Sequence, residues 1–210
     1  AAQIERALQY LEQQKSHLEA ADQKLVTDLL GKRKQILNHV QALAKRSVGG
    51  LRIRVHGDLH LGQILVVKGD AYLIDFEGEP ARPMHERRAK HSPYKDVSGV
   101  LRSFDYAAAM AVRSAQSVDT SPEAGAARRH VAEAYLGQAR EAFIEGYRST
   151  TTKLAHAWKD AKGESAALEL FTLEKTAYEV VYEAENRPTW LSVPLQGLRG
   201  LLNLSDGESQ

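Results

Sequence analysis

The chain has 210 residues, of which 43% are hydrophobic and 26% charged, a composition typical of a globular protein with one sizeable core. The formal net charge of +1 argues against a nucleic-acid-binding protein, because such proteins carry a strong positive field. No apolar run approaches the roughly 20 residues that span a bilayer, and no secretory signal is recognisable. Cysteine is absent, which fits a reducing compartment, so we expect a cytoplasmic protein.

An amphipathic helical pattern runs through residues 4–43, where apolar residues recur at spacings of three, four and seven. Lys15 and Asp22 fall on the apolar seam, and Gly31 interrupts the second half of the pattern. These interruptions favour a helical hairpin or a long bent helix over residues 1–47. A self-associating coiled coil is the alternative.

The strand signals are confined to one short region that follows a break at residues 47–50. Apolar and basic residues alternate over residues 51–55, which predicts a half-buried strand. Two further apolar runs, at residues 64–67 and 71–74, flank a turn that contains Gly69. This arrangement predicts a β-hairpin.

The rest of the chain is expected to be helical after an ordered loop over residues 79–93, which contains three prolines. Asp96 is well placed to cap the first of these helices, and Pro122 fits the first position of the second. The expected helices cover residues 96–112, 122–147, 154–158, 164–185 and 198–202. The predicted fold is therefore mainly α with a small β-hairpin insert. The expected organisation is a single lobe over residues 1–210, made of segments 1–47, 51–95 and 96–203 with a polar tail at 204–210.

Three oxygen-bearing side chains, Asp58, Gln63 and Asp75, flank the predicted hairpin. A hairpin folds back on itself, so the loop that enters its first strand and the residues that leave its second strand end side by side. Mg²⁺ prefers hard oxygen ligands and takes few of them from the protein. The pattern thus suits a magnesium site, with one carboxylate left to accept a proton from an attacking hydroxyl.

The same residues carry a resemblance to a known family. His56, Asp58 and Gln63 have the spacing of the catalytic loop of protein kinase-like enzymes, and Asp75 followed by Phe76 matches the start of their metal-binding motif. The His-Gly-Asp variant resembles the aminoglycoside phosphotransferase branch. Together with the segments at residues 73–83 and 173–190, the chain from about residue 50 onward resembles the maltokinases, including forms fused to trehalose synthase.

This resemblance implies the C-terminal lobe of a protein kinase-like, aminoglycoside phosphotransferase-like α+β fold, with ATP and Mg²⁺ as cofactors and maltose as the acceptor. Asp58 would be the general base, a role worth about 10²–10⁴ in rate. Gln63 and Asp75 would bind Mg²⁺, although Gln63 replaces the asparagine of the broader pattern and is one methylene longer. Asp96 would brace the catalytic loop, and maltose 1-phosphate would be the product.

The candidate substrate-binding residues are more open to alternative interpretations. Lys175, Tyr178 and Tyr182 share one helix face, which suits a sugar because aromatic planes and charged groups hold sugars, but such a stripe is also typical of a core. Arg187 joins them through the resemblance. The remaining candidates are His56, which also fits a scaffold histidine, and Glu77, which replaces the motif glycine and suits either a second metal or a sugar hydroxyl.

The residues leave further possibilities open. His60 completes a His-x-Asp-x-His pattern that suits zinc, but no fourth ligand is apparent nearby. The alternatives to a maltose kinase are a kinase for an aminoglycoside, choline, another sugar or another small alcohol, and a non-catalytic binding lobe. No glycine-rich loop or strand lysine is recognisable before residue 50, and residue 1 is not Met. We therefore expect the chain to lack the nucleotide-covering N-terminal lobe and to be inactive or nearly so alone. We expect no nucleic acid or membrane partner.

Overall fold

The structure, a computed structural model, describes residues 1–80, 82–116, 119–151 and 161–202. The chain forms two compact units, one made of Ala1–Gly49 with Ala161–Gln210 and the other of Gly50–Asp160. The first unit therefore joins the two ends of the chain, a pairing that the sequence pattern did not indicate. None of the described helices is long and apolar enough to cross a membrane.

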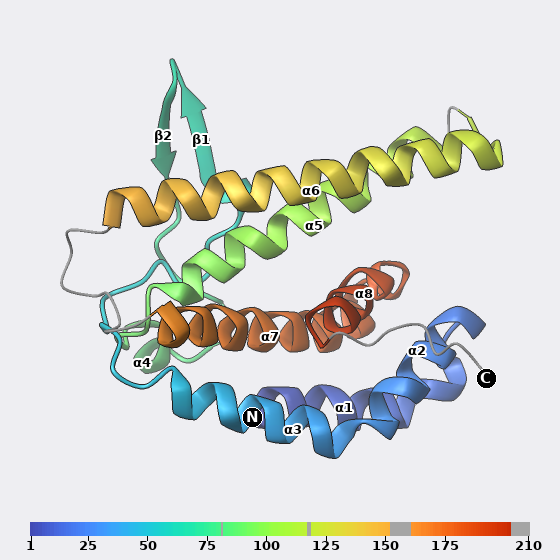
Figure 1. Ribbon diagram of the computed structural model, residues 1–210, viewed down its shortest axis with the longest axis horizontal. Coiled ribbons are helices and arrows are strands. Elements are labelled where there is room, and N and C mark those ends of the chain that lie inside the picture. Colours follow the sequence, from blue (N-terminus) through green and yellow to red (C-terminus); the bar gives the residue numbers. More distant parts are fainter. Residues whose placement is uncertain (81, 117–118, 152–160, 203–210) are drawn as a thin grey trace. The chain divides into compact units, whose positions relative to one another are not determined.

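The first unit consists of helices gathered around a long central helix near the end of the chain. Helix α7 (Ala161–Asn186) packs against α1, α3 and α8 (Figure 1). The other elements of this unit are α1 (Ala2–Gln14), η1 (Lys15–His17), α2 (Ala20–Gly31), α3 (Arg33–Arg46), η3 (Pro188–Trp190) and α8 (Ser192–Leu201).

The core of this unit is aliphatic and draws on every long helix in it. Burying one such side chain contributes about 1.5–3 kcal/mol. The largest fully buried aliphatic side chains of this core are Leu8, Leu11, Val26, Leu29, Val40, Leu173, Val180 and Leu195. The apolar seam of residues 4–43 is thus covered within the chain, which removes the basis for a coiled coil between chains.

The helical stretch expected over residues 4–43 is broken twice, so that it forms three helices. Lys15 stands at the end of α1, and Asp22 lies in the first turn of α2. Both residues occupied the apolar seam of the pattern. Because neither can be buried there without a partner, a break between them lets the chain change direction. Lys32 forms the second break, between α2 and α3.

The second unit holds the hairpin and two long helices. Its elements are η2 (Leu61–Gln63), β1 (Ile64–Val67), β2 (Asp70–Leu73), α4 (Met84–Arg87), α5 (Tyr94–Gln116) and α6 (Pro122–Thr151). Strand β1 pairs antiparallel with β2, which confirms the predicted hairpin. Lys68 and Gly69 form its two-residue turn, and both have positive φ values, of 52° and 89°. That combination defines a type I′ turn, whose twist matches the flanking strands.

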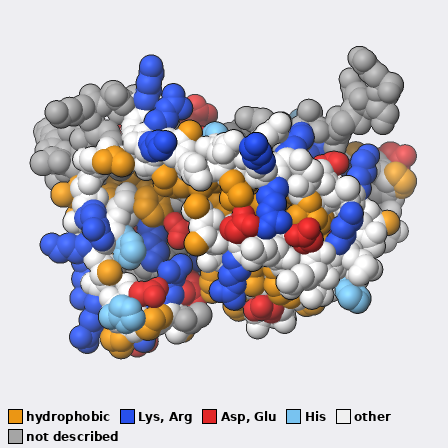
Figure 2. All heavy atoms as spheres, turned by 90° about the horizontal axis from the view of Figure 1, so that it is seen from below, with side chains coloured by type: hydrophobic (Ala, Val, Ile, Leu, Met, Phe, Trp, Pro, Cys, Tyr) orange, Lys and Arg blue, Asp and Glu red, His pale blue; other side chains and the backbone are white. Residues whose placement is uncertain are grey.

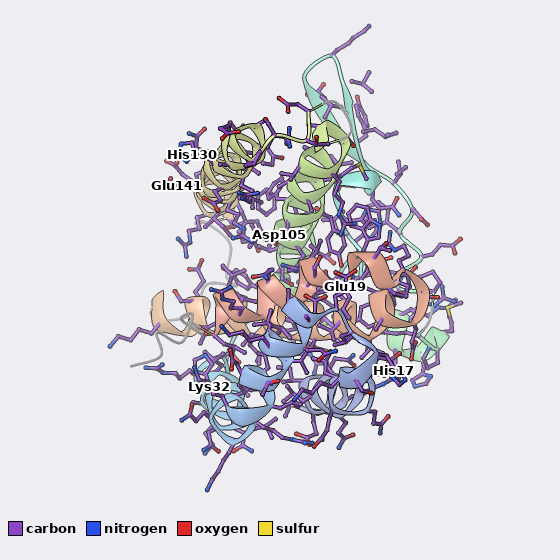
Figure 3. The ribbon with its side chains drawn as sticks, turned by 90° about the vertical axis from the view of Figure 1, so that its right-hand side faces the viewer. His17, Glu19, Lys32, Asp105, His130 and Glu141 are labelled. Atoms are coloured by element: carbon purple, nitrogen blue, oxygen red, sulfur yellow. The ribbon has the colours of Figure 1, made fainter. Side chains whose placement is uncertain are left out.

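Helices α5 and α6 run antiparallel and pack through aromatic side chains. Phe104 of α5 meets Phe143 of α6 edge to face, with ring centroids 6.0 Å apart. Asp105, labelled in Figure 3, accepts hydrogen bonds from the buried Arg102 at 2.7 Å and from Arg140 of α6 at 2.6 Å. The buried guanidinium thus has a carboxylate partner that also ties the two helices together.

The mainly helical fold with one small sheet is confirmed, but two local predictions are wrong. Residues 51–55 do not form a strand, since Ile53 makes only an isolated bridge to His91. Helix α5 begins at Tyr94, so Asp96 lies inside its first turn and does not cap it. The Asp96 carboxylate instead binds the backbone of a neighbouring loop.

Two predicted segments, residues 154–158 and 204–210, lie outside the described residues. The predicted start of α6 at Pro122 is confirmed, and the hydroxyl of Ser121 accepts the N–H of Ala124 at 3.3 Å. The predicted loop 79–93 contains the short helix α4. On the face drawn in Figure 2, charged side chains of both signs lie between apolar ones, in keeping with the net charge of +1.

Candidate active site

Asp96 holds the loop that contains Asp58. Its Oδ2 accepts the backbone N–H of His56 at 2.7 Å, and its Oδ1 accepts that of Gly57 at 2.9 Å. Hydrogen bonds to a charged acceptor contribute about 1.5–3 kcal/mol each. The carboxylate therefore fixes the two residues that immediately precede Asp58, from a position in the first turn of α5.

Two further residues of α5 contact the same loop. A Cβ added at Gly99 would lie 2.3 Å from the carbonyl oxygen of Leu59, so the loop approaches the helix where only glycine fits. Ser103 accepts the backbone N–H of Leu61 at 3.1 Å. Residues 96, 99 and 103 lie on one helix face, since they are three and four positions apart. Gly99 and Ser103 were not predicted from the sequence, although this spacing after Asp96 was an available signal.

Two glycines let the loop of Asp58 cross the segment that follows Asp75. Gly57 and Gly78 have φ values of 89° and 76°, in the left-handed region that favours glycine. A Cβ on Gly57 would lie 3.3 Å from the Cα of Gly78. Nη1 of Arg87 donates to the carbonyl of Glu77 at 3.3 Å, and the arginine side chain lies against Gly78. The glycine of the His-Gly-Asp sequence is thus required by this backbone crossing.

His56 links the same loop to the end of strand β2. The ring is buried, Nε2 lies 2.7 Å from the carbonyl oxygen of Ile74, and Nδ1 lies 3.4 Å from the backbone nitrogen of Asp58. A carbonyl can only accept and an N–H can only donate, so Nε2 carries the proton and Nδ1 accepts. The ring also contacts Phe76, with centroids 4.8 Å apart. Both ring nitrogens are engaged, which suits the scaffold interpretation of His56.

The hairpin brings Gln63 and Asp75 together, as its closure predicts. Nε2 of Gln63 donates to Oδ2 of Asp75 at 2.9 Å, and the backbone N–H of Ile74 donates to the carbonyl of Gln63 at 3.1 Å. Asp58 lies on the loop that His56 attaches to Ile74, the neighbour of Asp75. The three oxygen-bearing side chains are therefore carried by segments that are hydrogen-bonded to one another.

Asp75 has a strained backbone. Its φ of 64° lies in the left-handed region, which costs a residue with a side chain about 1–2 kcal/mol. Asp and Asn tolerate this region better than other residues. Its side chain is exposed and faces the amide of Gln63. Such strain at an exposed polar residue is typical of a functional position.

The paired side chains of Gln63 and Asp75 fit a magnesium ion. Mg²⁺ binds through one or two carboxylates, with phosphates and water completing its shell. A rotated amide of Gln63 presents its oxygen beside the carboxylate of Asp75, because the two amide ends have nearly the same shape. Glu77 is exposed, and its side chain has no described interaction that decides between a metal and a sugar hydroxyl.

Zinc fits the described residues poorly. Among them, no group of three or more His, Cys, Asp or Glu side chains is arranged to hold a metal. Nδ1 of His60 accepts the backbone N–H of Gly62 at 3.1 Å, and His56 uses both of its nitrogens elsewhere. The His-x-Asp-x-His pattern therefore serves the loop structure.

The candidate substrate-binding residues of α7 form a continuous surface row in the first unit. The rings of Tyr178 and Tyr182 stack with centroids 6.1 Å apart. Nζ of Lys175 lies 5.2 Å from the centre of the Tyr178 ring, and the Arg187 guanidinium lies 5.5 Å from that of Tyr182. Arg187 also lies over the ring of Trp190, at 5.9 Å. The row thus consists of two stacked rings with a cation over each, so hydrogen-bond donors lie at both of its ends.

Two buried carboxylates behind this row were not predicted from the sequence. Glu179 and Glu183 are 6% and 1% exposed, although both lie on the helix that carries the exposed Tyr182. Nε of Arg187 donates to Oε2 of Glu183 at 2.9 Å, so the buried charge has a partner. Lys175, Glu179, Glu183 and Arg187 are spaced by four. That spacing, with a Lys–Glu pair and a Glu–Arg pair each four residues apart, was the signal that could have found them.

Comparisons with known proteins point to sugar kinases. No known protein family profile matches the chain. It is 30% identical over 150 residues to a glucosamine kinase of Streptacidiphilus jiangxiensis, covering 71% of this chain and 32% of the relative. It is 32% identical over 149 residues to a glucosamine kinase of Mycolicibacterium smegmatis, covering 70% of this chain and 34% of the relative. The chain thus spans about a third of the length of these curated relatives.

Solved structures of glucosamine kinases match this chain over nearly its whole length. A glucosamine kinase in complex with glucosamine, ADP and inorganic phosphate matches with a TM-score of 0.72 and 26% identity, over 96% of this chain and 47% of that chain. A second glucosamine kinase structure, crystal form A, gives a TM-score of 0.70 and 25% identity, over 96% and 46%. The kinase-like fold is therefore confirmed, and the similarity supports a kinase-like sugar kinase family.

Proposed function

We propose that this chain is the catalytic lobe of an ATP-dependent sugar kinase that transfers a phosphoryl group with the help of Mg²⁺. The observation that carries the proposal is the contact of 2.9 Å between Gln63 and Asp75, beside a loop that Asp96 and His56 hold in place. The similarity to glucosamine kinases over most of the chain supports the same reaction class. ATP as donor agrees with the ADP and phosphate of the matched structure.

Each residue of the constellation has a role that its position supports. Asp58 orients the acceptor hydroxyl and takes its proton as the oxygen attacks the γ-phosphorus of ATP and ADP leaves, a role worth about 10²–10⁴ in rate. Gln63 and Asp75 bind the Mg²⁺ that neutralises charge on the nucleotide phosphates. His56 keeps the two segments in register through Ile74, and Asp96 holds the backbone before Asp58.

For the acceptor we propose maltose, converted to maltose 1-phosphate, on the resemblance of residues 73–83 and 173–190 to maltokinases. In this proposal the row formed by Lys175, Tyr178, Tyr182 and Arg187 contacts the sugar. The row extends over several turns of α7 and has a cation at each end, and this length suits a disaccharide better than a monosaccharide. The charge of Glu183 is taken up by Arg187, so this part of the row does not call for a cationic acceptor.

Glucosamine is the second candidate acceptor, because both curated relatives carry that name. An amino sugar is a cation near neutral pH and needs a carboxylate partner. The carboxylate of Glu179, buried beside the aromatic row, supplies negative charge there and favours this candidate, whereas that of Glu183 is taken up by Arg187. An aminoglycoside or another small alcohol belongs to the same reaction class and is distinguished by the same experiment.

The chain matches under half of the solved kinase, so we propose that the active protein also has a nucleotide-covering lobe. In kinases of this kind such a lobe supplies the groups that cover the phosphates. A fusion to or association with trehalose synthase is part of the maltokinase proposal. A non-catalytic binding lobe would need neither Mg²⁺ nor a nucleotide.

An acceptor screen tests these proposals. The full-length protein containing this chain is supplied with Mg-ATP and one of maltose, glucosamine, glucose, trehalose or an aminoglycoside, and ADP release and the product mass are measured. We expect Mg²⁺-dependent transfer to maltose. Preference for glucosamine or glucose would overturn the maltose assignment, and no transfer to any acceptor would overturn the kinase proposal in favour of a binding lobe.

A further inference from the structure

We propose that His60 and Ser103 are positioning residues for Gln63. This inference rests on the proposed function, in which Gln63 is a magnesium ligand. Gln63 ends the one-turn helix η2, whose residues are partly or fully exposed. So short and exposed a helix has little burial of its own, so its position depends on the groups that bind its backbone.

The three backbone N–H groups of η2 all have acceptors, and that of Gln63 makes the turn's own bond to the carbonyl of the cap residue His60. Leu61 donates to Oγ of Ser103 at 3.1 Å, Gly62 to Nδ1 of His60 at 3.1 Å, and Gln63 to the carbonyl of His60 at 2.9 Å. The first N–H groups of any helix lack partners within it and need such acceptors. Two of the three acceptors here are the side chains of His60 and Ser103.

Ser103 is prepared as an acceptor by a second hydrogen bond. Its hydroxyl donates to the carbonyl of Val100 one turn earlier in α5, at 2.7 Å. With the proton turned toward Val100, the lone pairs of Oγ face the N–H of Leu61. The start of η2 is thereby attached to α5, the helix that also holds Asp96 and Gly99 against the loop.

His60 acts as the N-cap of η2. Its backbone is extended, with φ of −151° and ψ of 171°, and its ring folds back over the turn to accept from Gly62. A Cβ on Gly62 would lie 2.9 Å from Nδ1 and Cε1 of this ring, so the glycine makes room for the cap. Asn is among the best N-cap residues because its side-chain oxygen can accept the same N–H. Leu has no acceptor.

A shift of η2 would move the amide of Gln63 away from Asp75. The side chain of Gln63 is one methylene longer than the asparagine of the related pattern, so the turn must hold its backbone at a matching distance. The observed contact of 2.9 Å between the two side chains depends on that placement. Small displacements of metal-binding groups weaken binding, which makes His60 and Ser103 determinants of magnesium affinity.

The test uses four variants of the full-length protein. Ser103→Ala and His60→Leu each remove one acceptor, and His60→Asn restores an acceptor at the cap. Ser98→Ala is the matched control, because Ser98 lies on the same helix and its Oγ donates to a carbonyl three residues earlier, at 2.9 Å, without a described contact to η2. The two measurements are amide hydrogen exchange at Leu61 and Gly62, and the Mg²⁺ concentration that gives half-maximal phosphoryl transfer.

We expect faster exchange at Leu61 in Ser103→Ala and at Gly62 in His60→Leu, by about fivefold for the loss of one hydrogen bond. The Mg²⁺ requirement should rise by a similar factor, while the acceptor KM stays the same and His60→Asn and Ser98→Ala resemble the wild type. Unchanged exchange in both loss variants would overturn the positioning role of His60 and Ser103, whether or not the protein is a kinase. Faster exchange with an unchanged Mg²⁺ requirement would overturn the link to Gln63, whereas an inactive wild type would overturn the proposed function.

Discussion

At the scale of single residues, Asp75 has a left-handed backbone and a proposed role as a metal ligand, and substitutions can test the two properties separately. Asn tolerates the left-handed backbone at least as well as Asp, but it binds Mg²⁺ less strongly because it carries no charge. We expect Asp75→Asn to keep the melting temperature and to lower Mg²⁺-dependent transfer by at least about 10², and Asp75→Ala to cost about 1 kcal/mol of stability as well. Thermal unfolding and an ADP-release assay measure the two effects. Near-normal turnover in Asp75→Asn would contradict the metal-ligand role.

The crossing of Gly57 and Gly78 permits a matched comparison. Gly57 and Gly69 have the same φ of 89°, but a Cβ meets the Cα of Gly78 only at Gly57 and nothing within 4 Å at Gly69. Replacing either glycine with Ala imposes the same backbone strain, of about 1 kcal/mol or more. We expect Gly57→Ala to be the more destabilising of the two in denaturant unfolding. Equal losses of stability would mean that the two crossing segments can move apart to accommodate the methyl group without loss of stability.

At the scale of elements, α5 is a platform for the loop of Asp58. Gly99→Ala would place a methyl group 2.3 Å from the carbonyl oxygen of Leu59, whereas Gly137→Ala in α6 meets nothing within 4 Å. Ala is favoured over Gly in a helix by about 1 kcal/mol, so Gly137→Ala should stabilise the protein. Gly99→Ala should instead lower stability and activity together. Denaturant unfolding and phosphoryl-transfer assays compare the two variants. Stabilisation of both would contradict the close contact between Gly99 and Leu59.

The contribution of Asp22, in the first turn of α2, to the stability of the protein depends on pH. Burial, with a smaller contribution from Glu19, raises the pKa of Asp22 above its usual value. The folded state therefore favours the protonated carboxyl, and the stability that this group supplies at low pH is lost as the pH rises through its folded pKa. We expect Asp22→Asn to raise the melting temperature at pH 7 and to have no such effect near pH 3. A stabilisation of equal size at both pH values would contradict this origin.

The elements also show why some of the structure could be predicted from sequence. The hairpin follows from two short apolar runs around a glycine turn, and hairpin closure alone predicts that Gln63 meets Asp75. Residues 51–55 alternate apolar and basic residues, but a strand needs a partner, and only Ile53 finds one, at His91. The contacts of Gly99 and Ser103 join segments about 40 residues apart. Their spacing after Asp96 places them on one helix face, but it does not indicate which loop that face contacts.

At the scale of the whole molecule, the hairpin carries apolar side chains on both of its faces. Leu65 and Tyr72 lie opposite each other on one face, and Val66 lies on the other. Their side chains are 47%, 54% and 74% exposed, and the hairpin extends away from the helices of its unit (Figure 1). A two-stranded hairpin with two apolar faces is marginal on its own in water.

The hairpin is exposed, and the 210-residue chain covers less than half of the solved kinase. We therefore predict how this chain behaves alone. Its first unit has a buried aliphatic core of its own, so we expect the helical circular dichroism of a folded protein. The groups that cover the nucleotide phosphates are not recognisable in it, so we expect turnover of Mg-ATP and sugar below about 1% of that of the full-length protein, a loss of about 2.7 kcal/mol in transition-state stabilisation. The two proteins are compared at equal concentration by ADP release. A folded chain that turned over at the full rate would show that these 210 residues hold the whole catalytic machinery.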